Sequence, residues 1–351
     1  MAHQDDDTGS GFESRVTIAD VALAAGVSKA TVSRFLNHRD TLLSPEIAAR
    51  VEKAVTALGY MPSPMAQALK RGRSRLIGLV VADIANPFSV AVLCGAEKAA
   101  QQAGYLVMLF NLGNASERER EAIEALASYQ VEGFILNTLG ADPDAAREVA
   151  RHGKPAVLVD RRQAGMRADF VSLDNADAMR QAVAHLQQGG WRELLYVTEP
   201  AAGVSSRLER VAAFEATVAA SAKTASGRVA QVDDPAALDD ELRALKRRAG
   251  RRPAAVVAGN ALVTLRVAAA VQRLGWRFGE DVGFIGFDDT EWAPLVGPGL
   301  TTIEQPTDDL GRIAASCLLE RLQGRDFPPR QILLAGRLVA RGSSQPARRG
   351  A

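Results

Sequence analysis

The stretch Val16-Thr-Ile-Ala-Asp-Val-Ala-Leu-Ala-Ala-Gly-Val-Ser-Lys-Ala-Thr-Val-Ser-Arg-Phe-Leu-Asn37 decides how this chain begins to fold. Apolar residues in its first half recur at three- and four-residue spacing, which predicts a helix with one buried face: Ile18, Val21, Ala22 and Ala25. Gly26 is expected to end that helix, and Ser28 to cap a second helix. Two short helices joined by the turn Ala25-Gly-Val-Ser28 have helix-turn-helix spacing.

The second helix is expected to bury Val32, Phe35 and Leu36. Its outer face then carries short or basic side chains, as insertion into a major groove requires: Lys29, Ala30, Thr31, Ser33 and Arg34. The alternative is an ordinary helical hairpin in which Ser and Thr merely cap. The turn, the polar outer face and the basic balance of the segment together favour DNA binding.

A third helix is indicated by Ser44 as cap, Pro45 at the first position and apolar residues that recur until Gly59. We therefore expect an N-terminal disordered tail over residues 1–14 and a helical DNA-binding domain over residues 15–60. Residues 61–75 are expected to form a hinge helix and a basic linker. In the hinge, Leu69 beside Lys70 is an apolar wedge flanked by cations that attract phosphate, although it could instead pack under the linker.

The formal net charge of +1 hides an uneven distribution along the chain. Residues 1–14 hold four acids and no base, and residues 15–75 hold ten basic against four acidic residues. Residues 76–351 hold 32 basic against 33 acidic residues. A basic segment on a nearly neutral body indicates a phosphate-binding module attached to a part with another task.

Composition excludes several other classes of protein. An apolar fraction of 47% with 24% charged residues is that of a soluble globular protein, and no apolar run approaches the roughly 18 residues of a membrane span. The acidic N-terminus is not a secretory signal, so we expect a cytoplasmic protein. Cys94 and Cys317 lie in apolar surroundings and are expected to be buried free thiols. With four histidines, they predict no structural metal site and no cofactor.

From Leu76 onward, short apolar runs alternate with amphipathic helices, which predicts parallel doubly wound sheets covered by helices. The expected strands are Leu76–Ala82, Tyr105–Phe110, Gly133–Asn137, Ala156–Val159, Leu194–Thr198, Ala254–Ala258 and Val282–Phe287, and the expected helices are Phe88–Ala103, Ser116–Ser128, Ala176–Gln188, Leu208–Ala220 and Leu262–Leu274. The segment is too long for one such sheet, so two lobes are expected. Ligands of such sheets bind beyond the carboxyl ends of the strands.

The helix-turn-helix stretch, continued by Leu58-Gly-Tyr-Met-Pro-Ser-Pro-Met-Ala-Gln-Ala-Leu-Lys70, resembles the headpiece and hinge of the LacI/GalR repressor family. The resemblance extends from Val16 to about Ser344. It implies an all-α headpiece and a two-lobed α/β core, like that of periplasmic binding proteins, over residues 76–345. The N-subdomain would span about 76–172 and 304–334, the C-subdomain about 173–303 and 335–345, and a tail 346–351. The resemblance assigns DNA contacts to Thr17, Lys29, Ala30, Thr31, Ser33, Arg34, Asn37, Ala66, Leu69 and Lys70.

The same resemblance implies an effector site between the lobes. It assigns this site to Asp83, Phe88, Asp160, Arg161, Ser206, Arg207, Arg210, Asn260, Asp288 and Trp292. Taken singly, Asp160, Asn260 and Asp288 could instead cap helices, and Arg207 and Arg210 could be solvated surface charges. Three arginines together favour an acid sugar, because guanidinium pairs bidentately with carboxylate.

Within the family, the chain is most similar to regulators of 2-ketogluconate and related sugar-acid metabolism, through Gly26–Arg34, Ala68–Gly78, Ser205–Arg210 and Pro294–Gly297. The resemblance implies a DNA-binding repressor, acting as a homodimer on a pseudo-palindromic operator. A solute-binding protein of a sugar transporter shares such a core but carries no fused helix-turn-helix. An enzyme is disfavoured because no nucleotide-binding or nucleophile motif occurs, so no catalytic residue is expected. Whether effector releases or promotes DNA binding stays open at this point.

Overall fold

The computed structural model describes residues 16–37, 43–61 and 73–345. These residues form two compact units, one within residues 1–74 and the other within residues 75–351. The predicted hinge helix, with Ala66, Leu69 and Lys70, lies outside the described residues, as do the two expected terminal tails.

The first unit is a bundle of three helices, α1 (Ile18–Ala25), α2 (Lys29–Asn37) and α3 (Pro45–Ala57). Gly26 ends α1 with φ of 62°, a left-handed conformation that glycine adopts at no steric cost. Ser28 Oγ accepts from the backbone N–H of Thr31 at 3.1 Å, so the predicted cap of α2 is confirmed. The core contains the predicted apolar stripe, with Val21, Val32 and Val51 fully buried.

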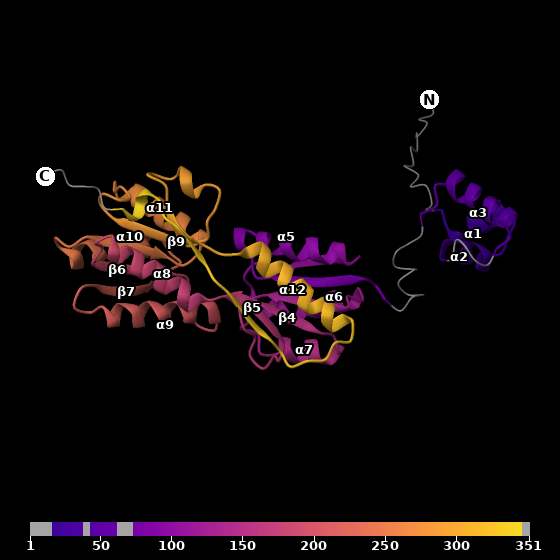
Figure 1. The fold of residues 1–351 in the computed structure, drawn as a ribbon, viewed down its shortest axis with the longest axis horizontal. Helices are drawn as coiled ribbons and strands as arrows, with labels where there is room; N and C mark the ends of the chain where they lie inside the picture. The colour runs from indigo at the N-terminus through magenta and orange to yellow at the C-terminus, as the bar shows by residue number, and fades with distance from the viewer. Residues whose placement is uncertain (1–15, 38–42, 62–72, 346–351) are drawn as a thin grey trace, which may run out of the picture. The chain divides into compact units, whose positions relative to one another are not determined.

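The second unit consists of two lobes, each built on a six-stranded sheet (Figure 1). The N-lobe comprises β1 (Leu76–Val81), α5 (Pro87–Gln102), β2 (Leu106–Asn111), η1 (Ser116–Arg118), α6 (Glu119–Ser128), β3 (Gly133–Asn137), α7 (Ala145–His152), β4 (Ala156–Val159), β5 (Asp169–Leu173), α12 (Thr307–Leu322) and β11 (Gln331–Leu334). Its strand order is β11-β5-β4-β3-β1-β2, all parallel.

The C-lobe comprises α8 (Asn175–Gln188), β6 (Glu193–Thr198), α9 (Ser205–Ala220), β7 (Ser226–Gln231), α10 (Pro235–Ala249), β8 (Ala254–Ala258), α11 (Ala261–Arg273), β9 (Gly283–Phe287), η2 (Ala293–Leu295), β10 (Thr301–Glu304), β12 (Arg337–Val339) and η3 (Gly342–Ser344). The strand order is β12-β10-β9-β8-β6-β7, and only β12 runs antiparallel to its neighbour. The expected two-lobed α/β core is therefore confirmed.

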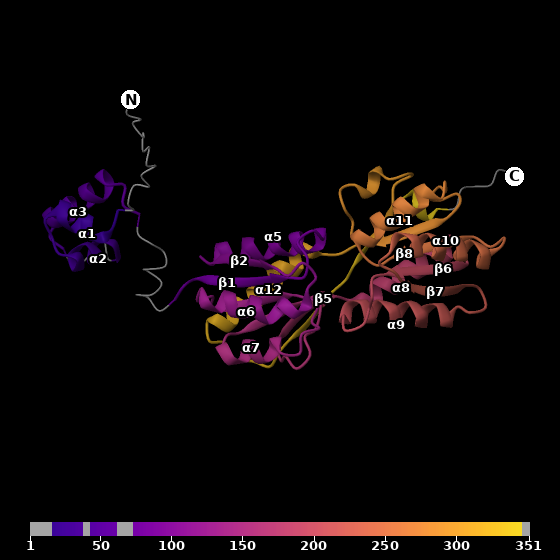
Figure 2. The same cartoon turned by 180° about the vertical axis from the view of Figure 1, so that it is seen from behind.

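Helices cover both faces of each sheet, and the buried side chains divide accordingly. In the N-lobe, α5 and α12 cover one face while α6 and α7 cover the other (Figure 1). In the C-lobe, α10 and α11 lie opposite α8 and α9 (Figure 2). Because the chain crosses between the lobes after β5, after β10 and after β11, both lobes are assembled from separate segments.

One expectation about the cysteines is wrong. Cys317 is buried on α12, but Cys94 is exposed on α5. Helix α5 buries Val92, Gly95 and Ala96, and the helical period then places position 94 on its exposed side.

Candidate functional site

The start of α2 presents an exposed, partly basic surface on the first unit. Lys29, Ala30 and Arg34 are exposed, whereas Thr31 and Ser33 are half-buried. Asn37 is the last residue of this helix. The outer face therefore has the short and basic side chains that a major groove admits.

The angle between α1 and α2 is fixed by contacts from outside the turn. Arg50, on α3, donates to the carbonyl of Ala25 through Nε at 3.1 Å and through Nη2 at 2.5 Å, and Nη2 also reaches the carbonyl of Gly26 at 3.0 Å. At the other end of α1, Thr17 donates to the carboxylate of Asp20 from its backbone N–H at 2.8 Å and its hydroxyl at 2.7 Å. The last four carbonyls of an α-helix have no partner within the helix and are open to donors such as Arg50.

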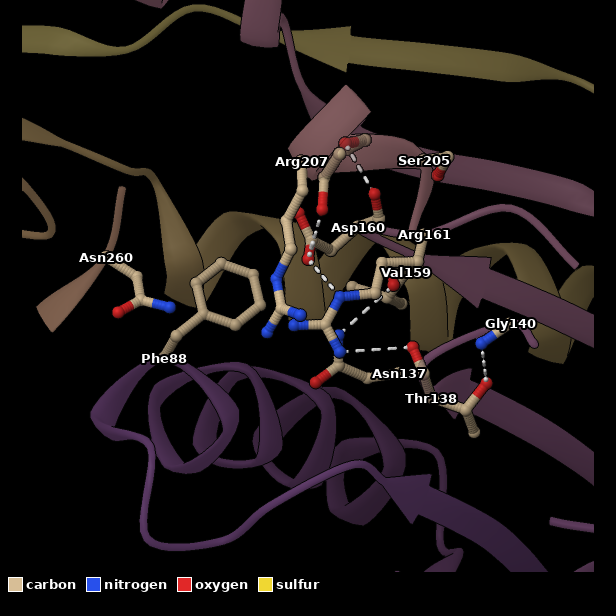
Figure 3. Close-up of polar contacts among 12 residues, drawn as sticks. Phe88, Asn137, Thr138, Gly140, Val159, Asp160, Arg161, Ser205, Arg207 and Asn260 are labelled. Atoms are coloured by element: carbon tan, nitrogen blue, oxygen red, sulfur yellow. Dashed lines mark hydrogen bonds and ion pairs between the residues drawn. The ribbon is translucent and has the colours of Figure 1, made fainter. Parts of the chain in front are cut away.

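In the second unit, the polar residues that follow the parallel strands meet where the two lobes face each other. Thr138 follows β3, Asp160 follows β4, and Glu199 follows β6. Figure 3 shows Asp160 and Arg161 from the N-lobe facing Arg207 and Ser205 of α9. This arrangement is the one that the ends of parallel strands produce.

The loop after β4 is the centre of this inter-lobe site. Asp160 has φ of 67° and is 5% exposed, and its Oδ2 lies 3.2 Å from Nε of Arg161. Oδ2 also accepts from the hydroxyl of Ser206 at 3.3 Å, which joins the two lobes. Among the described residues, Asp160 Oδ1 is buried without a hydrogen-bond partner, whereas Arg161 Nε has its ion pair with Asp160 Oδ2. A buried acceptor left unpaired is costly, so this site is suited to a ligand that can donate a hydrogen bond.

Charges of both signs surround Arg161. Loss of hydration lowers the pKa of Arg161. Among the neighbouring charges, Asp160 and Glu199 raise this pKa, and Arg207 and Arg210 lower it. Arg207 donates to Oε2 of Glu199 at 2.6 Å and to the carbonyl of Pro200 at 2.8 Å. An anion placed here would offset the repulsion between the guanidinium groups.

Arg210 is the most deeply placed of the three arginines, at 6% exposed. It donates to Oδ1 of Asn175 at 2.7 Å, to the carbonyl of Gly259 at 2.6 Å and to Oε1 of Gln305 at 3.4 Å. Its guanidinium carbon lies 4.2 Å from the centre of the Phe287 ring. Arg210 is thus no solvated surface charge, and it also links the chain segments that pass between the lobes.

Two of the predicted polar residues cap a helix. Asn260 Oδ1 accepts from the backbone N–H of Val263 at 2.9 Å, and Asp288 Oδ2 accepts from the backbone N–H of Ala261 at 2.9 Å. Both therefore hold the start of α11. Asn260 also donates to Glu199 at 2.8 Å, so its side chain is shared between the cap and the inter-lobe site.

A cavity of about 440 Å³ is lined among others by Phe88, Asp288, Trp292 and Gln305, but neither Asp160 nor any of the three arginines lines it. Phe88 comes from the N-lobe and Trp292 from the loop after β9, so the cavity opens between the lobes. Asp83 is not among its lining residues. That carboxylate instead accepts from Nδ2 of Asn114 at 3.0 Å and from the backbone N–H of Ala85 at 2.9 Å, within its own loop.

Glu199 and Thr138 belong to this site although sequence analysis did not name them. Glu199 directly follows a predicted strand, so its position at a carboxyl end was a usable signal. Among the described residues, no group of His, Cys, Asp and Glu could hold a metal ion. Nor does any helix in the described ranges have the length and apolarity needed to cross a membrane.

Comparisons with known proteins agree with both units. The pattern of bacterial regulatory proteins of the lacI family matches residues 17–63, and the periplasmic binding protein-like domain matches residues 183–344. The HTH-type transcriptional regulator PtxS of Pseudomonas aeruginosa is 46% identical over 95% of this chain and 96% of its own length. The HTH-type transcriptional regulator KdgR of Bacillus subtilis is 39% identical over 93% of this chain and 97% of its own length.

Solved structures of related regulators have the same fold. The lac repressor dimer bound to operator and the anti-inducer ONPF has a TM-score of 0.81 at 27% identity, covering 94% of this chain and 99% of that chain. The complex of the transcriptional regulator CelR with cellobiose has a TM-score of 0.68 at 27% identity, covering 94% of this chain and 100% of that one. The helix-turn-helix unit, the two-lobed core and the extent of these matches together show that this chain is a DNA-binding transcriptional regulator of the LacI family.

Proposed function

We propose that this protein is a repressor whose operator binding is controlled by a sugar acid, foremost 2-ketogluconate, bound between the two lobes. The observation that carries the proposal is the meeting of Arg161, Arg207 and Arg210 beside a buried, unpaired Asp160 oxygen. Guanidinium groups bind a carboxylate, and a free carboxylate oxygen accepts from sugar hydroxyls. The stretches that resemble regulators of 2-ketogluconate metabolism support the same effector class.

On the DNA side, Lys29 and Ala30 would read base edges, while Thr17, Thr31, Ser33, Arg34 and Asn37 would contact bases or phosphates. Ala66, Leu69 and Lys70 would act in the hinge, with Leu69 as the minor-groove wedge, over residues 61–75. A homodimer would place two such headpieces on a pseudo-palindrome. Effector that binds between the lobes would change their angle and weaken the hinge, and coupling of this kind is reciprocal.

The part of the proposal that concerns the effector is tested by calorimetric titration of the full chain with 2-ketogluconate, gluconate and glucose. We expect the two acids to bind below roughly millimolar and glucose to bind more weakly. Arg161→Ala should weaken 2-ketogluconate by about 10- to 100-fold, since a hydrogen bond to a charged group is worth about 1.5–3 kcal/mol. Arg312→Ala is the matched control, because Arg312 is exposed on α12 and pairs with Asp309, one helical turn away. If neither acid binds below roughly millimolar, the sugar-acid assignment is wrong.

Arg210→Ala is a weaker test than Arg161→Ala, since it would also remove the donor from three protein acceptors. The DNA half is tested by selecting an operator from randomised duplexes and following its binding by fluorescence anisotropy. Added 2-ketogluconate should release the selected duplex. Leu69→Ala should weaken binding to the selected duplex far more than binding to an unrelated one. Equal losses of affinity for the two duplexes would contradict the role of Leu69 as a wedge.

A further inference from the structure

A buried carboxyl group stands behind the inter-lobe site. Glu119 is the first residue of α6 and is 0% exposed. Its Oε1 accepts from the hydroxyl of Thr138 at 2.6 Å. Its Oε2 is buried and has no hydrogen-bond partner among the described residues. Neither the family assignment nor the proposed effector contacts give this residue a role.

Thr138 connects this carboxyl group to the effector site. Its carbonyl accepts from Nη1 of Arg161 at 3.2 Å, and its hydroxyl oxygen also accepts from the backbone N–H of Gly140 at 3.3 Å (Figure 3). Gly140 has φ of 72°, and a side chain there would place Cβ 2.2 Å from the carbonyl of Arg162. The loop after β3 therefore has little freedom to compensate for a change at Thr138.

The charges around Glu119 are few. Burial raises the pKa of Glu119 to about 7, Asp142 adds to this effect, and the bond from Thr138 opposes it. Asp142 does not belong to α6 but to the loop after β3, and its negative charge is the one that raises the pKa of Glu119. On α7, which packs against α6, Arg151 and His152 both pair with Glu148. Arg161 stands beyond Thr138, on the side of the effector site.

We propose that Glu119 is a positioning residue: its ionised carboxylate fixes Thr138 and thereby Arg161, so that effector affinity depends on the protonation of Glu119. The inference rests on the proposed function. An ionised carboxylate only accepts, so the Thr138 hydroxyl must donate to it in a charge-assisted bond. Protonation of Glu119 removes that charge. A proton on Oε2 would have no acceptor, and a proton on Oε1 would occupy the oxygen to which the Thr138 hydroxyl donates. Arg161 contacts the carbonyl of Thr138, so a change in the hold of Glu119 on Thr138 reaches Arg161 through one residue.

The test is a titration of the full chain with 2-ketogluconate at pH 6, 7 and 8. We expect the affinity to fall by about three- to tenfold from pH 8 to pH 6, in line with a shift of up to one pKa unit on binding. Glu119→Gln should keep the Thr138 bond and remove this pH dependence. Glu124→Gln, on the same helix but exposed, should retain it. Thr138→Val should give weak binding at every pH, and Thr138→Ser should behave like the natural chain.

A second measurement needs no ligand. The Nε–H signal of Arg161 in ¹⁵N-labelled full-length protein, assigned by its loss in Arg161→Lys, should shift with a midpoint near pH 7 and should stop shifting in Glu119→Gln. A signal that does not move between pH 6 and 8 overturns the inference, whether or not any sugar acid binds. A pH-independent affinity, or the same pH profile in Glu119→Gln, also overturns it. Failure of every sugar acid to bind contradicts the proposed function instead, and the Arg161 signal then decides the coupling alone.

Discussion

Ser206 Oγ donates to Asp160 Oδ2 at 3.3 Å, and this bond joins the start of α9 in the C-lobe to the end of β4 in the N-lobe. The neighbouring Ser205 makes a second link, since its Oγ accepts from the backbone N–H of Arg162 at 2.9 Å. Two successive serines thus hold the loop that carries Asp160 and Arg161. The two lobes are therefore joined by hydrogen bonds at residues that would bind the effector.

Ser206→Ala should loosen this link without unfolding the core. We expect the free energy of unfolding to fall by about 0.5–1.5 kcal/mol, as for the loss of one neutral hydrogen bond. The free energy of binding 2-ketogluconate should change by more than the free energy of unfolding does. Denaturant unfolding and calorimetry of the same preparation measure both. Ser316→Ala is the control, because Ser316 donates to the carbonyl of Arg312 within α12. Equal changes in affinity for the two variants would contradict the role of Ser206.

Arg50→Ala should destabilise the helix-turn-helix selectively. The carbonyls of Ala25 and Gly26 would lose their donor, so we expect about 1–3 kcal/mol less protection of the α1 and α2 amides. Hydrogen exchange of the full chain measures this, with the amides of the two lobes as internal reference. Arg50→Lys should restore only part of the protection, since one ammonium group cannot reproduce the fork of a guanidinium. Unchanged exchange in α1 would show that Arg50 does not fix the turn.

Gly95→Ala should destabilise the N-lobe although alanine is the better helix former. A Cβ at position 95 would lie 2.1 Å from the carbonyl oxygen of Asp308, so α5 and α12 would have to separate. We expect overpacking to cost about 3 kcal/mol, the upper end of its usual range, against a propensity gain of about 1 kcal/mol, so the variant should lose about 2 kcal/mol. Thermal unfolding measures it, and Cys94→Ala on the exposed side of the same helix should change little. A more stable Gly95→Ala variant would refute the close helix contact.

Glu119 should make stability fall as pH rises toward neutrality. Its pKa is about 7 in the folded chain and near 4.5 when unfolded, so the folded protein retains a proton that the unfolded chain has released. Its contribution is complete below pH 4.5 and is lost as pH rises through 7. Glu119→Gln should therefore gain about 3 kcal/mol relative to the natural chain between pH 4.5 and 8. The difference between the two unfolding curves at each pH isolates this group, and a constant difference would disprove the raised pKa.

Lys29→Ala should weaken binding to the selected operator by about 1–3 kcal/mol, which is the contribution of one side chain that contacts a base. Binding to an unrelated duplex should change less. Lys53→Ala, an exposed lysine on α3 outside the predicted contacts, is the control. A plot of the logarithm of the binding constant against the logarithm of the salt concentration should have a slope of roughly −0.9 per neutralised phosphate. We expect the basic residues of the headpiece to account for this slope. Parallel losses on both duplexes would assign Lys29 to phosphate contact.

Sequence reasoning placed the elements with strong local signals. Gly26, Ser28 and Ser44 set the helix ends of the headpiece, and seven apolar runs became β1, β2, β3, β4, β6, β8 and β9. It did not name β5, β7, β10, β11 and β12. Strand β5 begins at Asp169, a buried acid held by Arg321 and Arg330, and β7 is a half-exposed edge strand with a polar sequence. Their pairing comes from tertiary contacts rather than from a local pattern.

The same distinction applies to the effector site. Asp160, Arg161 and Asn260 could be named because they follow apolar strands, and Glu199 was open to the same argument. The sequence around Glu119 carried no such signal, since an acidic residue at the start of a helix is ordinarily exposed to solvent and stabilised by the helix dipole. Only the fold shows that this carboxyl group lies beneath Thr138.

The three passages between the lobes determine the order in which the protein is completed during synthesis. The headpiece has its whole core once residue 60 has been made, whereas the N-lobe lacks α12 and β11 until residue 334. At about 5–20 residues per second, a nascent chain therefore carries a complete headpiece for many seconds before its effector site can form. A chain that stops before Thr307 would retain the helix-turn-helix unit but lack α12, β11 and β12, so both lobes would be incomplete. Control of DNA binding by the proposed effector would therefore also require that these last strands have been translated.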